Sequence, residues 1–484
     1  MKNLGCPSVG SWSSRYRPYL RIKEFCRIVD VVNDQAHCLL FQYGGNANVH
    51  ILQAGVKVLL RQTALVFAGK MTAACLGFAM SLVVARLMGP EAFGLFSLFI
   101  VILILGNDLL GDGLNPGVVR YYAMHSLTNP IRASEVLTNA LALRLLLGIP
   151  VVLLGAVLGG QIAERLFQNS AYVLPIILGL VGSLGAALWS FDLAAWQSRQ
   201  DFVTYALMVG LVNLLRVLSL PILILMGHLT LGAVMGLHVA FFYMCTLAGL
   251  WLLRRHLATF QFNGALLREL FRFSKWPAMA STCFLLQVNL GVPVLNYFYS
   301  SREAGVYAAG TSLLQGIDFL TISLLTTLLP KVSQLTSLEQ CRAYVQRSFP
   351  MYLGLAICLV PVMFFARPLV VGLFGIAYEG TIPVFQILFI GALGTMVTQP
   401  LYLVLYTINR PQLYTFSGFV ALGAWILAGL WLVPEYGAVG AALTTLFARL
   451  IQSVMIVVIL WYALEFSRSS GLATRSMISN VRES

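Results

Sequence analysis

Seven ionisable side chains lie inside apolar segments of this sequence, and their chemistry constrains its function more than any other feature. They are Lys70, Asp108, Asp112, Arg144, Arg216, Asp318 and Arg449. A charged group at the centre of a bilayer is costly unless it faces a cavity or a partner. Four of the seven are cations, which favours a cavity that binds anionic groups.

Polar neighbours extend two of these positions into stripes at relative positions 0, 4 and 7. The two stripes are Thr311, Gln315 and Asp318, and Thr445, Arg449 and Gln452. At 3.6 residues per turn, these positions share one helix face. Each stripe is therefore expected to face the protein interior and not lipid.

The cations predict a phosphate-binding cavity, because Lys and Arg bind phosphate oxygens and the planar guanidinium can do so with two hydrogen bonds. The predicted substrate-binding residues are Lys70, Arg144, Arg216 and Arg449. Asp318, near the middle of its helix, and Asp108 are the predicted binding residues for a coupling ion, H⁺ or Na⁺.

Structural alternatives exist for each of these groups. The cations could extend along their helices to the membrane surface, as long basic side chains do. Asp108 and Asp112 could pair with Arg120 or Arg132, and Asp318 could form a buried pair with an arginine.

The composition predicts an integral membrane protein. Hydrophobic residues make up 59% of the 484 residues and charged residues 10%, and the mean hydropathy is +0.83. Soluble domains carry about 25% charged residues. The net charge of +13 is spread over short loops between apolar runs, so no nucleic-acid partner is expected. The cysteines and histidines show no metal-ligand spacing, and neither a metal nor another cofactor is expected.

Apolar windows of roughly 20 residues, each able to span the bilayer as a helix, predict about twelve transmembrane helices and hence an all-α membrane fold. The first six are expected near 63–85, 93–113, 136–158, 171–191, 203–226 and 230–253. The second six are expected near 276–298, 304–329, 349–371, 381–403, 412–433 and 438–463.

The loop charges predict that both termini are cytoplasmic. With the N-terminus inside, the inward segments hold 23 Lys and Arg residues and the outward loops hold four, Arg86, Arg165, Arg302 and Arg367. Cytoplasmic loops carry this excess of basic residues. The expected domains are a poorly ordered extension (1–55), a six-helix bundle (56–255), a cytoplasmic linker (256–275), a second six-helix bundle (276–465) and a cytoplasmic tail (466–484).

An internal repeat relates the two bundles. Gly89–Phe96, with the sequence GPEAFGLF, aligns with Ser301–Tyr307, with the sequence SREAGVY, at an offset of 211. Gly232–Val234 and Gly437–Val439 form a second pair, offset by 205, and each opens the last helix of its half. Six helices per half keep the same topology, so the halves should be related by an axis along the membrane normal.

The segment Val83–Ala123 resembles the polysaccharide-biosynthesis branch of the multidrug/oligosaccharidyl-lipid/polysaccharide (MOP) export superfamily. Arg86-Leu-Met-Gly-Pro90 and Glu91-Ala-Phe-Gly94 match the turn between the first two helices of that family, and Glu303–Tyr307 matches the turn between its seventh and eighth. The resemblance covers roughly residues 57–465. It implies two six-helix bundles forming a V-shaped central cavity, in the bacterial inner membrane.

The resemblance also implies a function. A flippase of this family would move a polyprenyl-pyrophosphate-linked oligosaccharide from the cytoplasmic to the periplasmic leaflet by alternating access. Its partners would be lipid-linked oligosaccharide and membrane lipids, with a polysaccharide polymerase and chain-length proteins as further candidates. O-antigen, capsule and exopolysaccharide pathways all remain open.

Two other functions compete with this prediction. A cation-coupled multidrug exporter of the same fold would favour carboxylates and aromatic residues in its cavity. A membrane-embedded glycosyltransferase or polymerase would need catalytic carboxylates and a sizeable loop outside the membrane. The longest internal loops are about twenty residues, which favours a transporter over an enzyme.

Overall fold

The computed structural model describes residues 46–126, 128–257, 263–332, 335, 337–407 and 411–469. Within these ranges the chain is helical and has no β-strand. Contacts divide it into two compact units, Met1–Ala68 and Gly69–Ser484. Of the predicted extension, residues 1–45 lie outside the described residues, and of the predicted tail, residues 470–484 do. Residues 46–55 belong to the first described helix, α3.

The first half of the chain forms six main helices with short connecting turns. They are α3 (Asn46–Leu110), α4 (Asn115–Ser126), α5 (Pro130–Ile162), α6 (Val173–Ser198), α7 (Phe202–Leu225) and α8 (Leu231–Leu253). The turns include η2 (Asp112–Leu114), the single π-helical turn η3 (Ala163–Phe167), η4 (Ser170–Tyr172) and η5 (Arg254–His256).

The second half forms a similar series. Its helices are α9 (Gly264–Asn289), α10 (Gly291–Phe298), α11 (Ser301–Val332), α12 (Leu338–Leu359), α13 (Ala366–Phe374), α14 (Thr381–Thr407) and α15 (Pro411–Ser469), with η6 (Val360–Phe365) and η7 (Ile376–Tyr378). α9 begins at Gly264 and not near residue 276, because Leu266, Leu270 and Ser274 form a buried helical face within a segment too polar to be read as a membrane span.

The two longest helices each consist of two helices joined at a glycine. α3 is interrupted at Gly89 (φ 79°, ψ 174°). Pro90 begins the next helix, a position where the backbone N–H that proline lacks would have no partner within the helix. α15 is interrupted at Gly437 (φ 57°, ψ −131°), and the backbone N–H of Ala438 donates to the Glu303 carboxylate at 3.2 Å. A carboxylate at a helix N-terminus is favourable, so Glu303 helps to fix this break.

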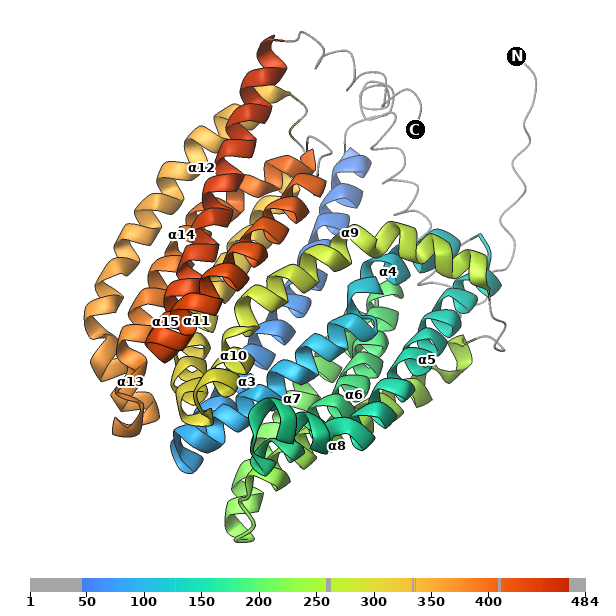
Figure 1. The fold of residues 1–484 in the computed structure, drawn as a ribbon. Helices are drawn as coiled ribbons and strands as arrows, with labels where there is room; N and C mark the ends of the chain where they lie inside the picture. Colours follow the sequence, from blue (N-terminus) through green and yellow to red (C-terminus); the bar gives the residue numbers. More distant parts are fainter. Residues whose placement is uncertain are drawn as a thin grey trace, which may run out of the picture. The chain divides into compact units, whose positions relative to one another are not determined.

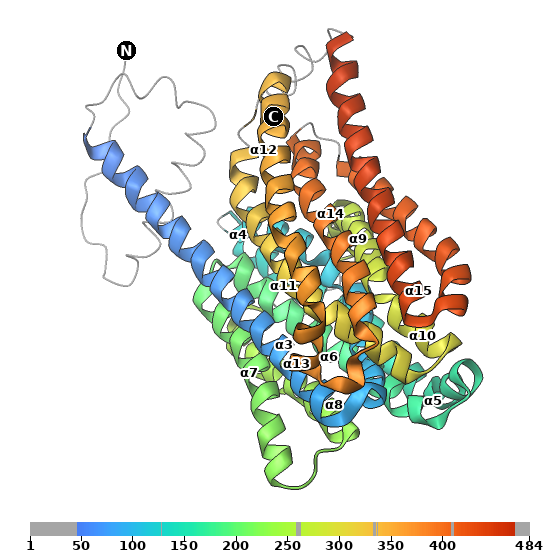
Figure 2. The ribbon, with the colours of Figure 1, turned by 90° about the vertical axis from the view of Figure 1, so that its left-hand side faces the viewer.

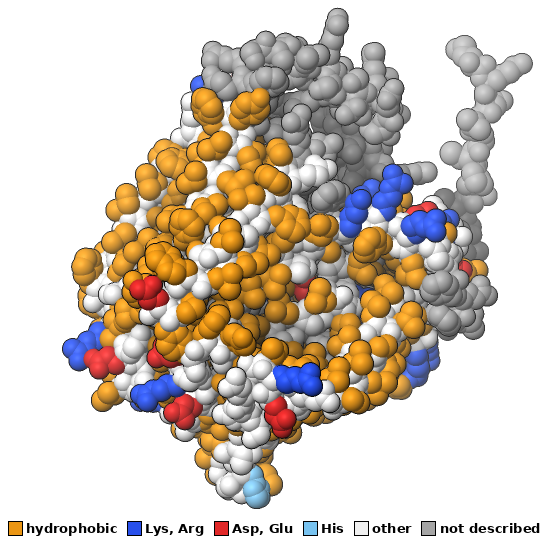
Figure 3. Space-filling view, viewed as in Figure 1, with side chains coloured by type: hydrophobic (Ala, Val, Ile, Leu, Met, Phe, Trp, Pro, Cys, Tyr) orange, Lys and Arg blue, Asp and Glu red, His pale blue; other side chains and the backbone are white. Residues whose placement is uncertain are grey.

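The helices have the length and surface of membrane spans. Among the described residues, eight helices are long and apolar enough to cross a bilayer, or nine when α9 and α10, bent by 43°, are counted as one. Large apolar side chains such as Val157 and Leu427 are about three-quarters exposed. Figure 3 shows hydrophobic side chains across most of the visible face and charged ones near its edges. The fold is therefore an all-α membrane fold, whereas the count of twelve spans stays a prediction.

The unit Gly69–Ser484 contains two groups of helices (Figures 1 and 2). We call α3 from Gly69 onward and α4–α8 the N half, and α10–α15 the C half. In the N half, α6 packs against α5 and α8, and α7 against α8. In the C half, α14 packs against α11, α12 and α15. The resulting core includes buried residues of both halves.

Helix α9 connects the two halves. Near its start, the Asn263 backbone N–H donates to Asn139 Oδ1 of α5 at 2.9 Å, and Phe273 packs under the Arg120 guanidinium of α4. Near its end, Gln287 Nε2 donates to the Gly418 carbonyl of α15 at 2.9 Å. α9 is thus bonded to the N half over its first turns and to the C half over its last turns.

The two repeat motifs meet each other at a close helix crossing. A Cβ added at Gly94 would overlap the backbone carbonyl of Ser301, and one added at Gly305 would overlap the carbonyl of Pro90. The offset of 211 pairs Gly94 with Gly305 and Pro90 with Ser301, so the contact is reciprocal. A reciprocal contact of this kind is consistent with a pseudo-twofold axis between the halves.

Two further bonds join the halves near this crossing, at the end predicted to be periplasmic. Arg86 Nη1 donates to the Gly372 carbonyl at 3.0 Å, and the Tyr378 hydroxyl donates to the Ala85 carbonyl at 2.9 Å. Tyr378 is buried between Phe93 and Phe374. In this conformation the halves are therefore held together at that end.

Candidate functional site: two polar pockets

The larger pocket lies in the N half and has a volume of about 460 Å³. Its lining comes from α3, η2, the start of α4, α6, α7 and α9. The polar and aromatic lining residues are Lys70, Asn107, Asp112, Asn115, Trp189, Ser190, Gln197, Tyr205 and Ser281. Trp189 Nε1 and Asn107 Oδ1 are buried without a hydrogen-bond partner. Ligand pockets span about 300–1,000 Å³, so this one can take a small polar ligand or one segment of a larger one.

Lys70 is the only one of the four predicted substrate-binding cations that lines this pocket, and its side chain is exposed. The lining also holds the carboxylate of Asp112. Asn115 Nδ2 donates to Asp112 Oδ1 at 2.6 Å, which fixes that carboxylate in the wall. The pocket therefore combines one cation and one anion with amides and two aromatic side chains.

Arg144 is buried between helices, with 1% of its surface exposed. Its Nη2 donates to the Gly111 carbonyl at 2.7 Å and to Asn115 Oδ1 at 2.5 Å, and its Nη1 donates to the Ala140 carbonyl at 3.0 Å. The bonds from Nη2 satisfy a carbonyl and an amide oxygen between the end of α3 and the start of α4, and the bond from Nη1 goes to a carbonyl of its own helix, α5. Arg144 thus does not extend along its helix to the protein surface and lines neither of the two pockets in this conformation, and its predicted contact with substrate stays a prediction.

Gly111 makes this arrangement possible, and alanine there should destabilise the protein. The residue has φ +145°, which L side chains rarely adopt, and a Cβ would overlap the Arg144 side chain. Such backbone strain costs about 1–3 kcal/mol. We expect Gly111→Ala to lower the melting temperature of the purified protein. Gly210→Ala is the matched control, because nothing lies within 4 Å of its added Cβ. Gly111 lies at the break between α3 and α4, and an equal fall in melting temperature for both variants would contradict a special role for glycine at this break.

Asp108, near the end of α3, joins the N half to the connecting helix α9. It is 5% exposed and accepts hydrogen bonds from Ser281 Oγ at 2.9 Å and Thr282 Oγ1 at 2.5 Å, both on α9. We call this the inner contact. The alternative that Asp108 pairs with Arg120 is not what the structure shows, because the Arg120 guanidinium lies over Phe273, 4.4 Å from the ring centroid.

Arg216 lies in the packed interior of the N half. It is 8% exposed, its guanidinium carbon lies 3.8 Å from the centroid of Phe242, and its Nε and Nη2 atoms have no hydrogen-bond partner. A guanidinium over an aromatic face is attracted by the ring. Arg216 lines neither the N-half pocket nor the smaller pocket of the C half, so its predicted role in substrate binding also stays a prediction.

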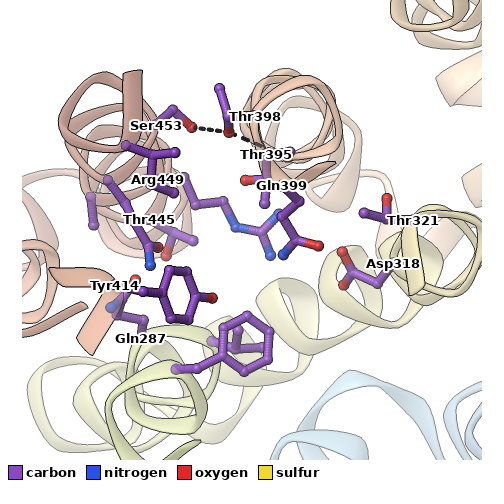
Figure 4. Close-up of a pocket in the computed structure, with 15 residues that line it drawn as sticks. Gln287, Asp318, Thr321, Thr395, Thr398, Gln399, Tyr414, Thr445, Arg449 and Ser453 are labelled. Carbon is purple, nitrogen blue, oxygen red and sulfur yellow. Dashed lines mark hydrogen bonds between the residues drawn. The ribbon is translucent and has the colours of Figure 1, made fainter. Parts of the chain in front are cut away.

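The smaller pocket lies in the C half and has a volume of about 50 Å³, room for a few water molecules. Figure 4 shows Asp318 of α11 facing Arg449 of α15 and Gln399 of α14 across it. The polar lining residues are Gln287, Asp318, Thr321, Thr395, Thr398, Gln399, Tyr414, Thr445, Arg449, Gln452 and Ser453. Arg449 Nη1 is buried without a hydrogen-bond partner. Asp318 and Arg449 interact electrostatically. Among the described residues, however, they do not form an ion pair with an N–O distance of 4 Å or less.

The predicted stripes meet at this pocket in part. Thr445, Arg449 and Gln452 all line it, whereas Asp318 is the one member of the other stripe that does. Thr445 Oγ1 also accepts from Trp425 Nε1 at 3.1 Å and lies 3.0 Å from the Tyr307 hydroxyl. These bonds hold the Arg449 helix against α11 and the first part of α15.

The four predicted cations therefore do not share one cavity. Lys70 lines the N-half pocket, Arg449 lines the C-half pocket, and Arg144 and Arg216 are packed between helices. Among the described residues, no group of three or more His, Cys, Asp or Glu side chains could hold a metal ion.

Sequence comparison decides the family. Residues 59–336, more than half of the chain, match the polysaccharide biosynthesis protein family. The chain belongs to this family. The match contains Lys70, Asp108, Arg144, Arg216 and Asp318, whereas Arg449 lies beyond it. No curated protein matches the chain in sequence.

Solved structures of transporters share the fold. The lipid II flippase MurJ in an inward closed conformation matches with a TM-score of 0.70 and 14% identity, covering 86% of this chain and 92% of MurJ. An inward-facing multidrug resistance MATE family transporter of the MOP superfamily matches with a TM-score of 0.67 and 15% identity, covering 82% and 96%. A MOP superfamily transporter from Pyrococcus furiosus matches with a TM-score of 0.54 and 15% identity, covering 85% and 96%.

These likenesses show the fold and not the cargo, because one fold serves many functions. Together with the family match and the apolar helices, they make this polysaccharide biosynthesis family member a multi-pass membrane protein with the fold of the MOP superfamily transporters. The sugar, the coupling ion and the direction of transport are matters for proposal.

Sequence reasoning missed several site residues. Gln287, Gln399 and Tyr414 line the C-half pocket. They were missed because they are not part of a polar stripe at helical spacing. Asp192, a buried carboxyl group of α6 that lines neither pocket, was missed because the fourth helix was expected to end at residue 191, whereas α6 continues to Ser198. A search for every carboxylate within one turn of a predicted helix end would have found it.

Proposed function

We propose that the protein is a flippase that moves a polyprenyl-pyrophosphate-linked oligosaccharide from the cytoplasmic to the periplasmic leaflet for polysaccharide biosynthesis. The N-half pocket is the main support. Its amides, hydroxyls and aromatic side chains can hydrogen-bond sugar hydroxyls and pack against sugar rings, and Lys70 supplies a positive charge for a phosphate. The candidate pathways are those of O-antigen, capsule and exopolysaccharide.

Lys70 is proposed to meet the pyrophosphate, because it is the exposed cation of the pocket that is large enough for a ligand. The flexible lysine side chain ends in a compact charge that does not need one fixed hydrogen-bond geometry, which suits a mobile phosphate group. Arg144 is proposed to act by holding the wall residue Asn115 in place.

Asp318 and Arg449 are proposed to couple transport to H⁺ or Na⁺. Their pocket is too small for a sugar in this conformation but large enough for an ion with water. An ionisable residue inside a membrane marks an ion or substrate pathway by default. The opposite charges of the two side chains would let a bound cation compete with Arg449 for Asp318.

Both termini are proposed to be cytoplasmic, and cysteine labelling tests this orientation. In a background without native cysteines, Arg165→Cys should react with an impermeant thiol reagent added outside cells, and Arg255→Cys should react only after the membrane is permeabilised. Both side chains are exposed, so access depends on the side of the membrane. The reverse pattern would contradict the orientation that loop charges predict.

A depletion experiment tests the cargo class in cells. Cells that lose the protein should accumulate the lipid-linked oligosaccharide in the cytoplasmic leaflet and stop making the polymer, and the restored gene should reverse both effects. A cation-coupled multidrug exporter is the competing function, supported by the likeness to the MATE fold. Increased drug sensitivity with normal polymer would favour the exporter and contradict the flippase.

A further inference from the structure

Asp192 is a buried carboxyl group that the proposed transport cycle leaves unused. It is 1% exposed, and both carboxylate oxygens are buried without a hydrogen-bond partner. It lies on α6 against α8, where a Cβ added at Gly249 would overlap Asp192 Oδ2. Gly249 therefore makes the room that this side chain occupies.

An ionised carboxylate cannot be held in this way without compensation. Burying an isolated charge costs far more than a protein can supply, and the group becomes neutral instead. The charged or titratable groups that interact electrostatically with Asp192 are Arg144 of α5 and the Cys245 thiol of α8. Arg144 also faces Asp112.

Arg144 does not hydrogen-bond to Asp192 in this conformation. Its Nη atoms donate to Gly111, Asn115 and Ala140, and only its Nε lacks a partner. The structure thus contains an unpaired carboxyl group beside a guanidinium whose other donors are already engaged at the break between α3 and α4.

We propose that Asp192 is a proton-binding site, protonated in this conformation, and that Arg144 becomes its partner when the proton leaves. Gain or loss of the proton changes the carboxyl group between a neutral acid and an anion, and no other reactant is needed. The proton site depends on the packing of α6 against its neighbours and not on the identity of the cargo.

A proton suits this site better than a metal cation. Na⁺ needs several oxygen ligands around it, as other hard cations do, and within the part of the chain that the structure describes no group of three or more His, Cys, Asp or Glu side chains could hold a metal ion. The positive charge of Arg144 also opposes a second full cation. Protonation requires no further ligand.

The N-half pocket lies beside the helix that carries Asp192, and the break between α3 and α4 lies beside Arg144. Ser190, Leu193 and Ala194 of the same helix line the N-half pocket, so one helix face separates Asp192 from it. If Arg144 turns to Asp192, the Gly111 carbonyl and Asn115 lose their donor. Asp108, which forms the inner contact, lies one turn before this break. Loss of the proton should therefore loosen the segment that carries the inner contact.

Infrared difference spectroscopy of the purified full-length protein in liposomes tests the proton site directly. Low-pH minus high-pH spectra should contain the C=O band of a protonated carboxylic acid, and Asp192→Asn should remove one component of it. Asp201→Asn is the matched control: Asp201 caps α7, asparagine caps equally well, and the band should be unchanged. Asp192→Glu should keep a titrating component with an altered frequency, and it serves if Asp192→Asn does not fold.

The effect on the break has its own readout. A nitroxide spin label attached at Pro116→Cys, beside the break, should become more mobile as the pH rises, and the addition of Asp192→Asn should abolish that change. Spectra identical for the wild type and the Asp192 variants would overturn the proton site. A mobility change that persists without Asp192 would overturn its link to Arg144. Neither measurement uses a cargo, so failure of the flippase proposal would leave both results interpretable.

Discussion

Alanine in place of Gly94 or Gly305 should destabilise the protein more than alanine in place of Gly111. At both positions the added Cβ would overlap a backbone carbonyl of the opposite half, and backbone atoms cannot move aside as the end of a flexible side chain can. Overpacking of this kind costs about 1–3 kcal/mol and occasionally more. We expect a several-fold loss of folded protein in the membrane and a lower melting temperature for each variant.

Two glycines on the same helices provide matched controls. Nothing lies within 4 Å of a Cβ added at Gly77 of α3 or Gly316 of α11. Alanine there should be neutral or stabilising, since it removes the conformational freedom of glycine from a helix. Because the crossing is reciprocal, Gly94→Ala and Gly305→Ala should have similar effects. A harmless change at either position would contradict the close crossing of the two halves.

Arg449→Gln should lower substrate flux by an order of magnitude or more while expression stays near normal. The substitution removes the charge that faces Asp318 in the C-half pocket (Figure 4), and ionisable residues inside a membrane mark ion or substrate pathways. Arg449→Lys should restore flux only in part, because lysine keeps the charge but lacks the planar fork. Flux measured in proteoliposomes, normalised to the amount of protein, reports the effect.

Asp318→Asn should change the ion dependence of flux more than the binding of substrate. Flux measured against pH and against Na⁺ concentration separates the two roles, since a coupling residue changes these profiles and a substrate contact changes the concentration dependence on cargo. Wild-type flux in Arg449→Gln would rule out a role for this cation. An unchanged ion profile in Asp318→Asn would leave Asp318 as a structural partner only.

The helices and the relation between the halves could be predicted from the sequence because both depend on local patterns. Apolar windows located the spans, and the offset of 211 residues correctly pairs Gly94 with Gly305 at the crossing. The start of α9 was not predicted, because Gly264–Lys275 is stabilised by packing of Leu266 and Leu270 and not by hydropathy.

The partners of the charged residues could not be predicted from one helix at a time. Arg144 binds the break at Gly111, 33 residues away, and Asp108 binds hydroxyls on α9 that lie 173 and 174 residues away. Helical spacing indicates which residues share a face but not which helix that face meets. The sequence therefore identified charges that avoid lipid without showing that they divide between two pockets and a buried interior.

The flippase proposal is tested most directly by reconstituting the purified protein in liposomes that contain a polyprenyl-pyrophosphate-linked oligosaccharide. An enzyme or lectin that cannot cross the membrane detects the sugar in the outer leaflet. The protein should equalise or invert the leaflet distribution far faster than protein-free liposomes, with flux reduced in Lys70→Gln, since Lys70 is the proposed phosphate contact in the N-half pocket. No acceleration with this cargo, together with ion-driven uptake of organic cations by the same liposomes, would contradict the proposal.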